Sequence, residues 1–434
     1  MAYAPYLWRD NSTGGTPITA ARLNAIEQGI YNAAAAADSV GQVVNGINPV
    51  TGWFHVTNFG ATGDGVTIDR TSIQTAINAA NSAYGTTGTR QSVYFPPGVY
   101  LVDAVNYTKS DTTVYGAVSL MLLDGVDLIG PGTIKVKSGA YGSGAFYGVI
   151  RSKDTGLSHS TIRGLSIDGN TSGNVSSGQC NNILLVALTD VSVEETRHPA
   201  CNGNVIQITG VSSSNVATNI RVNRNVILAG NTIGIQVSQF DGIEINSNVV
   251  YGTADNCIDV YGENGSATPS GTNFQINNNF LRGGSCGVFL ETVAHGQAIG
   301  NVIKSPTQSG VHVNRINGAP SDILVSQNTI IGGPLGMYVT GDTGGVTMRG
   351  NTVSGSTTAC VQLGGGGNCS YVYVIDNSLD TATQNTVPLV STTSNQIAFN
   401  RVRGTITFNT NRSLDLVNTA TTSVGNTFSS ANVA

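Results

Sequence analysis

The second half of the chain repeats one short pattern of apolar and polar residues. Segments of alternating polarity end at an Asn that an apolar residue follows, as in IRVNRNVI, IEINSNVV, FQINNNFL and VTMRGNTV. The seven intervals between these asparagines span 175 residues, a mean of 25, which is about the length of one coil of a parallel β-helix. Asn suits the sharp turn because it tolerates positive φ, and stacked Asn side chains can form a hydrogen-bonded ladder. The repeat therefore predicts an all-β solenoid, and the repeated positions are Asn225, Asn248, Asn279, Asn301, Asn328, Asn351, Asn377 and Asn400.

Each repeat has an earlier strand as well, seen in GIQVSQ, CIDVYG, GVFLET, GVHVNR, GMYVTG and CVQLGG. Alternation turns the first and third apolar residues inward and the middle residue outward. Because stacked coils lie about 4.8 Å apart, outward residues of successive coils form columns. The first column is Gln207, Gln236, Asp259, Phe289, His312, Tyr338 and Gln362, and the second is Thr209, Ser238, Tyr261, Glu291, Asn314 and Thr340.

These columns predict a glycan-binding face. Aromatic rings stack on the apolar faces of sugars, and amides and carboxylates bind sugar hydroxyls. The predicted substrate-binding residues are Gln207, Gln236, Tyr261, Phe289, Asn314, Arg315 and Tyr338.

The candidate catalytic residues Asp259, Glu291 and His312 lie on three successive coils of this face. Two carboxylates on neighbouring coils, offset by two residues, should be about 8 Å apart. An inverting glycosidase needs this separation, because a water molecule sits between its acid and its base. Asp255, at the turn that enters the strand, is a fourth candidate.

Other interpretations of the same residues stay open. A lyase would use His312 or Tyr338 as its base, near a group such as Arg315 that neutralises a substrate carboxylate. The simplest alternative is that all are ordinary polar residues on an exposed strand. A second acid pair, Asp168 and Glu194, is expected about 5 Å apart on adjacent coils; Arg197 nearby favours a structural ion pair there. No Cys/His spacing suggests zinc, and we expect neither metal nor cofactor.

The N-terminal segment predicts self-association. Apolar residues at 23, 26, 30, 33, 37, 40 and 44 follow a heptad spacing, which indicates a coiled coil, and its isoleucines favour three strands. An amphipathic helix packed on its own domain is the alternative. The stretch WRDNSTGGTPITAARLNAIEQGI, from Trp8 to Ile30, resembles the attachment segment of bacteriophage tail-appendage and receptor-binding proteins. That resemblance implies a virion protein anchored to other tail or baseplate proteins by this end.

The block FGATGDGVTIDRTSIQTAINAANSA combines a Gly-rich turn, Asp69 as a possible N-cap, and a helix with one apolar face. It resembles the N-terminal segment of the pectate-lyase-like superfamily, in which such a helix caps a right-handed parallel β-helix. The related polygalacturonases place NTDG, DDC and GHG at the starts of three successive strands. The matching positions here read NTIG from 231, DNC from 255 and SCG from 285, so only Asp255 carries over.

Composition narrows the function classes. Charged residues make up 10% of the 434-residue chain, against roughly 25% in an average domain, yet 40% are hydrophobic, which disfavours disorder. The net charge of −5 and the five lysines argue against a nucleic-acid partner. No apolar run is long enough to cross a membrane, and the first residues do not form a secretory signal. The six cysteines include two pairs close in sequence, Cys180/Cys201 and Cys360/Cys369, whose bonding the sequence leaves open.

Together these observations predict a homotrimeric phage tailspike located in the virion and assembled in the host cytoplasm. Residues 1–50 would form the attachment segment, 51–410 the β-helix, and 411–434 a C-terminal tail or cap. The protein would bind a bacterial surface polysaccharide, and we favour hydrolytic cleavage of that polymer. The alternatives are a non-catalytic adhesin for host attachment, a lyase on the same fold, and a secreted bacterial pectin-type enzyme.

Overall fold

The computed structural model describes residues 52–108, 114–140, 146–174, 180–262, 270–315, 320–341, 343–364 and 369–380, with short stretches nearer both ends. Ala25, Ile26 and Gln28 are helical, but the rest of the predicted attachment segment and coiled coil lies outside the described residues. The predicted C-terminal tail also lies outside them, apart from two short strands between 421 and 428.

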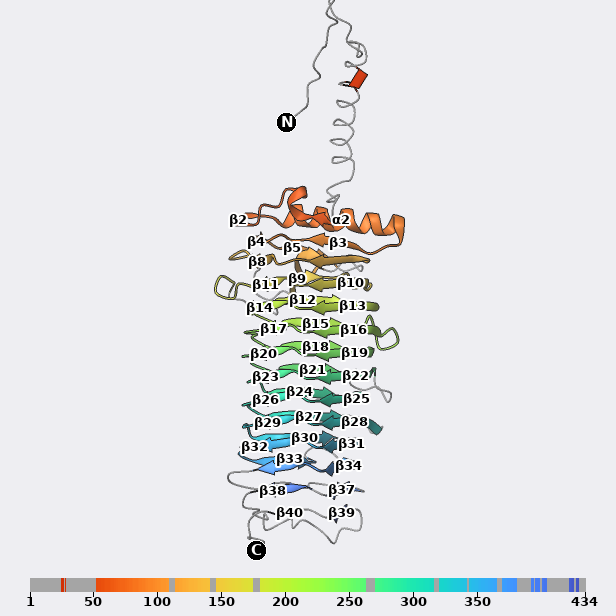
Figure 1. Cartoon of the computed structure of the whole chain (residues 1–434), viewed down its shortest axis with the longest axis vertical. Coiled ribbons are helices and arrows are strands. Elements are labelled where there is room, and N and C mark those ends of the chain that lie inside the picture. The colour runs from red at the N-terminus through yellow and green to blue at the C-terminus, as the bar shows by residue number, and fades with distance from the viewer. Residues whose placement is uncertain are drawn as a thin grey trace, which may run out of the picture.

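The chain winds through three sheets that run the length of the molecule (Figure 1). Sheet A contains β1 (Phe54–His55), β3 (Gln91–Tyr94), β7 (Val126–Ile129), β10 (Ser158–Arg163), β13 (Thr189–Glu194), β16 (Ala217–Asn223), β19 (Phe240–Asn246), β22 (Gly271–Asn277), β25 (Ala294–Ile299), β28 (Pro320–Ser326), β31 (Gly344–Arg349), β34 (Cys369–Ile375), β36 (Thr392–Thr393), β37 (Asn395–Ala398) and β39 (Thr421–Val424). Sheet B contains β2 (Asp64–Ile68), β4 (Val99–Val102), β8 (Thr133–Val136), β11 (Ser166–Asp168), β14 (Arg197–Ala200), β17 (Val226–Ile227), β20 (Val249–Tyr251), β23 (Phe280–Arg282), β26 (Val302–Lys304), β29 (Thr329–Ile331), β32 (Thr352–Ser354), β35 (Ser378–Asp380), β38 (Arg401–Arg403) and β40 (Thr427–Phe428). Sheet C contains β5 (Val105–Thr108), β6 (Val114–Met121), β9 (Phe146–Arg151), β12 (Cys180–Val186), β15 (Ile206–Thr209), β18 (Ile235–Ser238), β21 (Ile258–Tyr261), β24 (Cys286–Glu291), β27 (Ser309–Arg315), β30 (Leu335–Gly341) and β33 (Ala359–Leu363).

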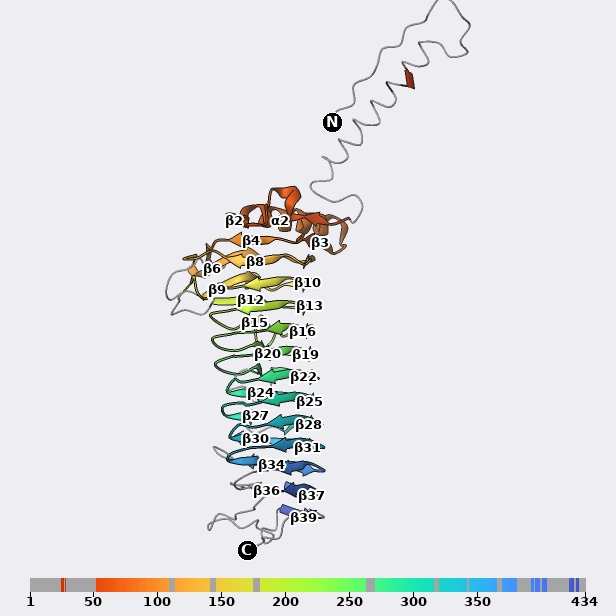
Figure 2. The same cartoon turned by 60° about the vertical axis from the view of Figure 1, so that its left-hand side comes forward.

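Each full coil visits the sheets in the order C, A, B, and successive coils pair in parallel. Figure 2 shows the same stack of coils from a second direction. Inward apolar residues of all three sheets fill the interior, as Ile235, Val237, Ile258 and Val260 do on sheet C. The right-handed parallel β-helix predicted from the repeat is confirmed.

The repeated asparagines form one continuous ladder at the turn from sheet A to sheet B. The backbone N–H and the side-chain Nδ2 of Asn248 both donate to Oδ1 of Asn279, at 2.9 and 3.0 Å. Nδ2 of Asn279 donates to Asn301 in turn and to the carbonyl of Ile245, at 2.9 and 2.8 Å. The same pattern continues to Asn400, and every ladder side chain is buried.

One detail of the turn differs from the prediction. The left-handed residue is not the ladder Asn but the one before it, for example Arg224 (φ 59°), Ser247 (φ 59°) and Gln327 (φ 55°). The Asn is therefore selected for its buried hydrogen bonds, since it does not itself adopt positive φ.

Helix α2 (Arg70–Thr87) lies across the N-terminal end of the coils, after the 3₁₀ turn η1 (Val56–Phe59) (Figure 1). Ile73, Ala76, Ile77 and Ala80 form its buried face, as predicted. Asp69 is at the N-cap position but makes no capping bond with its side chain. Its carboxylate accepts the backbone N–H groups of Thr62 and Gly63 at 2.7 and 3.0 Å, because the preceding Gly-rich turn folds back onto it.

All six cysteines are buried and none forms a disulfide, so neither of the two sequence-adjacent pairs is bridged. Cys201 instead donates a hydrogen bond from Sγ to the carbonyl of Cys180 at 3.1 Å. Among the described residues, no helix is both long enough and apolar enough to span a membrane.

Candidate functional site

Both predicted columns exist on the outer face of sheet C. Asp259 is paired in register with Gln236 on one side and with Phe289 on the other. Tyr261 is paired in the same way with Glu291. The remaining members of each column follow in register from β15 to β33.

The two central carboxylates occupy different environments. Asp259 is only 7% exposed, and its Oδ1 is buried with no hydrogen-bond partner among the described residues. Nδ2 of Asn256 lies 3.4 Å from its Oδ2. Burial, with a smaller effect from the Glu291 charge, raises the pKa of Asp259 to about 7. Glu291, one coil on and two residues further along the strand, is half-buried, and burial raises its pKa as well.

His312 forms the centre of an aromatic stack beside this pair. Its ring centroid is 4.5 Å from that of Tyr338 and 4.7 Å from that of Phe289, on the two neighbouring strands. Nε2 lies 2.8 Å from Thr340 Oγ1, and Nδ1 lies 4.0 Å from Cys286 Sγ. Burial lowers the pKa of His312 to about 4, so the imidazole is neutral at pH 7.

Amide side chains lie on the two coils that precede the coil of Asp259. Oε1 of Gln236 accepts a hydrogen bond from Asn204 Nδ2 at 2.8 Å, and Oε1 of Gln207 accepts one from Asn181 Nδ2 at 2.6 Å. These asparagines form a supporting row together with Asn256, and none of the three was among the predicted site residues. The signal was present, because each of these asparagines stands two residues before the first inward apolar residue of its strand.

The other predicted residues are less central. Asp255 is exposed at the turn before β21, where its backbone bonds to Thr232 and Ser285 align the three turns as the polygalacturonase comparison placed them. Asn314 is half-buried and accepts a hydrogen bond from Thr340 Oγ1 at 3.0 Å. Arg315 is the last residue of β27, opposite Gly341, and its side chain lies outside the described part of the chain.

The second acid pair was predicted wrongly. Asp168 lies on sheet B beside Lys135, with 3.7 Å between Oδ2 and Nζ. Glu194 lies on sheet A, where Arg224 contacts it at 2.9 Å. The three-residue strand around Asp168 resembles the end of a sheet A strand in sequence. The prediction therefore placed Asp168 on the same sheet as Glu194, whereas it lies on sheet B.

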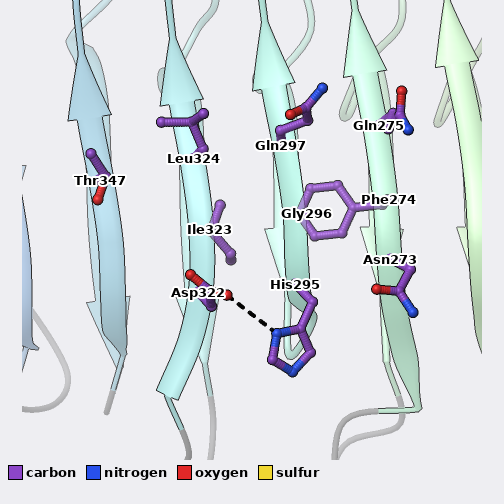
Figure 3. Close-up of a pocket in the computed structure, with 10 residues that line it drawn as sticks. All are labelled: Asn273, Phe274, Gln275, His295, Gly296, Gln297, Asp322, Ile323, Leu324 and Thr347. Atoms are coloured by element: carbon purple, nitrogen blue, oxygen red, sulfur yellow. Dashed lines mark hydrogen bonds and ion pairs between the residues drawn. The ribbon is translucent and has the colours of Figure 1, made fainter.

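The surface also has a hollow away from sheet C. It measures about 480 Å³ and lies on sheet A across β22, β25, β28 and β31 (Figure 3). Its lining residues are Asn273, Phe274, Gln275, His295, Gly296, Gln297, Asp322, Ile323, Leu324 and Thr347. None of the predicted site residues lies in it.

Comparisons with known proteins agree with this architecture. The family model described as rhamnogalacturonase A/epimerase, pectate lyase-like, matches residues 53–384. Mannuronan C5-epimerase AlgE4 of Azotobacter vinelandii is 41% identical over 130 residues, which cover 28% of this chain and 21% of the epimerase. The matched segment thus spans about a fifth of that relative's length.

Two solved structures share the fold. The A-module of AlgE6 from Azotobacter vinelandii superposes with a TM-score of 0.65 at 21% identity, covering 87% of this chain and all of the module. The tailspike of Escherichia coli bacteriophage HK620, solved with a hexasaccharide, superposes with a TM-score of 0.58 at 11% identity, covering 86% and 77%. At these identities both matches show the fold alone. The family model covers most of the chain, and the protein therefore belongs to the rhamnogalacturonase A/epimerase, pectate lyase-like family.

Proposed function

We propose that this protein is a phage tailspike that binds a bacterial surface polysaccharide on sheet C and cleaves it with Asp259 and Glu291. The single observation that carries the catalytic part is the contrast between these two neighbouring acids. Asp259 is buried, its Oδ1 has no hydrogen-bond partner among the described residues, and burial raises its pKa to about 7, whereas Glu291 is half-buried. Unequal environments of this kind divide the acid and base roles between two carboxyl groups.

In the proposed reaction, protonated Asp259 donates its proton to the glycosidic oxygen, and the sugar leaves as an alcohol. Ionised Glu291 takes a proton from a water molecule, whose oxygen attacks the anomeric carbon from the opposite face. The configuration at that carbon inverts, as the offset of the two acids by one coil and two residues favours. Neighbouring sugars would lie along the columns, with the rings of Phe289 and Tyr338 on one side and Gln236 on the other.

The test is release of reducing ends from polysaccharide of the host bacterium. Asp259→Asn and Glu291→Gln should each lower the rate by at least about 100-fold, in the range found when a general acid or base is removed. Asp376→Asn is the matched control, since Asp376 is an exposed acid outside sheet C. Unchanged rates in both site variants would reject the carboxylate pair.

The same assay separates the two alternatives. A lyase would release unsaturated sugar ends, which absorb ultraviolet light, and His312→Ala would abolish them. The neutral imidazole of His312 beside Tyr338 is the observation that favours this second candidate. An adhesin would bind the polymer without releasing any ends.

The assignment to a virion rests on the N-terminal segment. The resemblance of residues 8–30 to tail-appendage attachment segments and the heptad spacing that follows support a homotrimer joined to other tail proteins by this end. Deleting residues 1–50 should leave polysaccharide binding intact and prevent incorporation into virions, which immunoblotting of purified particles would measure.

A further inference from the structure

The outer face of sheet B carries a column of apolar residues that the proposed function does not use. Val226, Val249, Phe280 and Val302 are paired in register on four successive coils, and we call them the sheet B stripe. Each is partly exposed, while the next residue of each strand is buried in the core. An outward column is expected to be polar, so a run of apolar side chains indicates a contact surface.

Neighbouring residues extend the stripe. The ring centroid of Tyr251 lies 5.7 Å from that of Phe280. Ile331 lies on β29, two coils beyond Phe280, in the adjoining outward column that contains Arg282 and Lys304, and it is 40% exposed. On the outer face of sheet A, the outward residues Arg221, Glu244, Gln275 and Gln297 occupy successive coils, and all four are polar. Of the two sheets that meet at the Asn ladder, the apolar outer surface on these coils therefore lies on sheet B.

Two cations border the stripe. Arg282 and Lys304 follow it on β23 and β26, and Lys304 Nζ lies 5.3 Å from the Phe280 ring centroid. Within the part of the chain that the structure describes, neither has an acidic partner within ion-pair distance. Sheet A carries exposed acids at neighbouring levels, namely Asp241 and Glu244 on β19 and Asp322 on β28. Two sheet A acids, Asp241 and Glu244, are thus available to the sheet B cations, whereas Asp322 already contacts His295 at 3.4 Å and Arg349 adds a positive charge to sheet A.

The two faces also meet at one corner of every coil. A turn of two residues joins sheet A to sheet B, as between Asn223 and Val226, and the Asn ladder runs along it. A closed ring of identical chains brings two different surfaces of each chain together. With this corner directed at a three-fold axis, sheet B of one copy meets sheet A of the next. Sheet C then remains on the outside, open to a polymer.

We propose that the sheet B stripe packs against sheet A of a second copy of this chain, in a closed trimer around the Asn ladder corner. The hollow on sheet A supplies the receiving surface, because it spans β22 to β31, the levels of Phe280 and Val302 (Figure 3). At Gly296, which lies between Phe274 and Ile323 in register, the Phe274 ring fills the space that a side chain would occupy, so the hollow is shallow there. This inference rests on the homotrimer of the proposed function and is independent of the catalytic residues.

The test is thiol labelling of the full-length chain, after light scattering has confirmed three times the chain mass. All six native cysteines are buried, so a Cys placed on the surface is the accessible thiol. Val302→Cys and Leu324→Cys probe the two faces of the proposed contact, and Gln362→Cys is the control on sheet C. All three positions are partly exposed in a single chain.

We expect maleimide to label Val302→Cys and Leu324→Cys at least tenfold more slowly than Gln362→Cys. Phe280→Glu places a charge in the contact. In that background, labelling of Val302→Cys should become as fast as that of the control, even if the predicted N-terminal coiled coil keeps the chains together. A monomeric wild type, or equal labelling rates at all three positions in the trimer, would overturn the proposal. A trimer that shows the protection but cleaves no polysaccharide would reject the hydrolase and leave this interface in place.

Discussion

Replacing Asp259 with Asn should stabilise the protein at alkaline pH while it abolishes cleavage. In the folded chain, burial raises the pKa of this carboxyl from its ordinary value of 3.8 to about 7. The unfolded chain releases the proton near pH 4, so between about pH 4 and pH 7 the folded state holds a proton that the unfolded state does not. Folding stability contributed by this group is therefore complete at acid pH and is lost as the pH rises to about 7.

The size of the effect follows from the pKa difference. Moving a carboxyl pKa from 3.8 to about 7 corresponds to about 4 kcal/mol between low and high pH, as an order of magnitude. Little of this is lost to solvent screening, because the side chain is 7% exposed. An Asn at the site carries no charge at any pH. Asp259→Asn should thus gain up to about 4 kcal/mol relative to wild type between pH 4 and pH 8.

Urea unfolding of both proteins at the two pH values measures this difference directly. Comparing the change with pH, rather than stability at one pH, cancels any packing effect of the amide. Asp376→Asn serves as the control, since that acid is exposed and lies outside sheet C. An Asp259→Asn protein that changes with pH in parallel with wild type would refute a buried, protonated Asp259 and with it the general acid.

Three further results are expected. The kcat/KM for cleavage should depend on pH as a bell-shaped curve. It should fall above about pH 7 as Asp259 ionises, and fall in acid as Glu291 is protonated. A profile that is flat from about pH 4 to 9 would contradict these roles. Asn279→Ala should lower the free energy of unfolding, measured in urea, by about 2–4 kcal/mol, because it leaves the buried N–H of Asn248 and the carbonyl of Ile245 without their partner. The control Gln275→Ala, at an exposed position, should change that free energy by no more than about 0.5 kcal/mol. Tyr338→Ala, made in the inactive Asp259→Asn protein, should weaken oligosaccharide binding by about tenfold in calorimetry. The control Tyr371→Ala, on sheet A, should leave binding unchanged. Equal losses in the two variants would show that the aromatic stack has no specific part in glycan binding.

The repeat made most of the fold predictable. Because coils stack at a fixed distance, a spacing near 25 residues placed Asn225 to Asn400 in one row and set the register of the sheet C columns. The prediction failed where the period is weak. Near Asp168 the strands are only three or four residues long, so sequence alternation alone could not separate sheet B from sheet A.

The site was predictable in position but not in its energetics. Alternation identified Asp259 as an outward residue, which suggests exposure, yet its neighbours bury it, and no described residue donates a hydrogen bond to its Oδ1. The supporting Asn256 lies in the preceding turn, at a regular offset from the strand, but its contact with Asp259 follows only from the side-chain geometry. The stack around His312 likewise depends on the orientation of the rings, which the amino-acid sequence alone does not specify.

The stabilising and destabilising parts of each coil are separated in space. At the corner between sheets A and B, the buried polar groups of the central ladder residues are hydrogen-bonded, as the four bonds around Asn279 illustrate. On sheet C, the same coils hold a buried carboxyl, one oxygen of which has no hydrogen-bond partner in the described part of the chain, and this group costs stability once it ionises. Since each coil contacts mainly its neighbours, the ladder can offset that cost locally. A change at Asn279 or Asn301 should therefore disturb cleavage as well as stability, because those residues close the coils that carry Asp259 and Glu291.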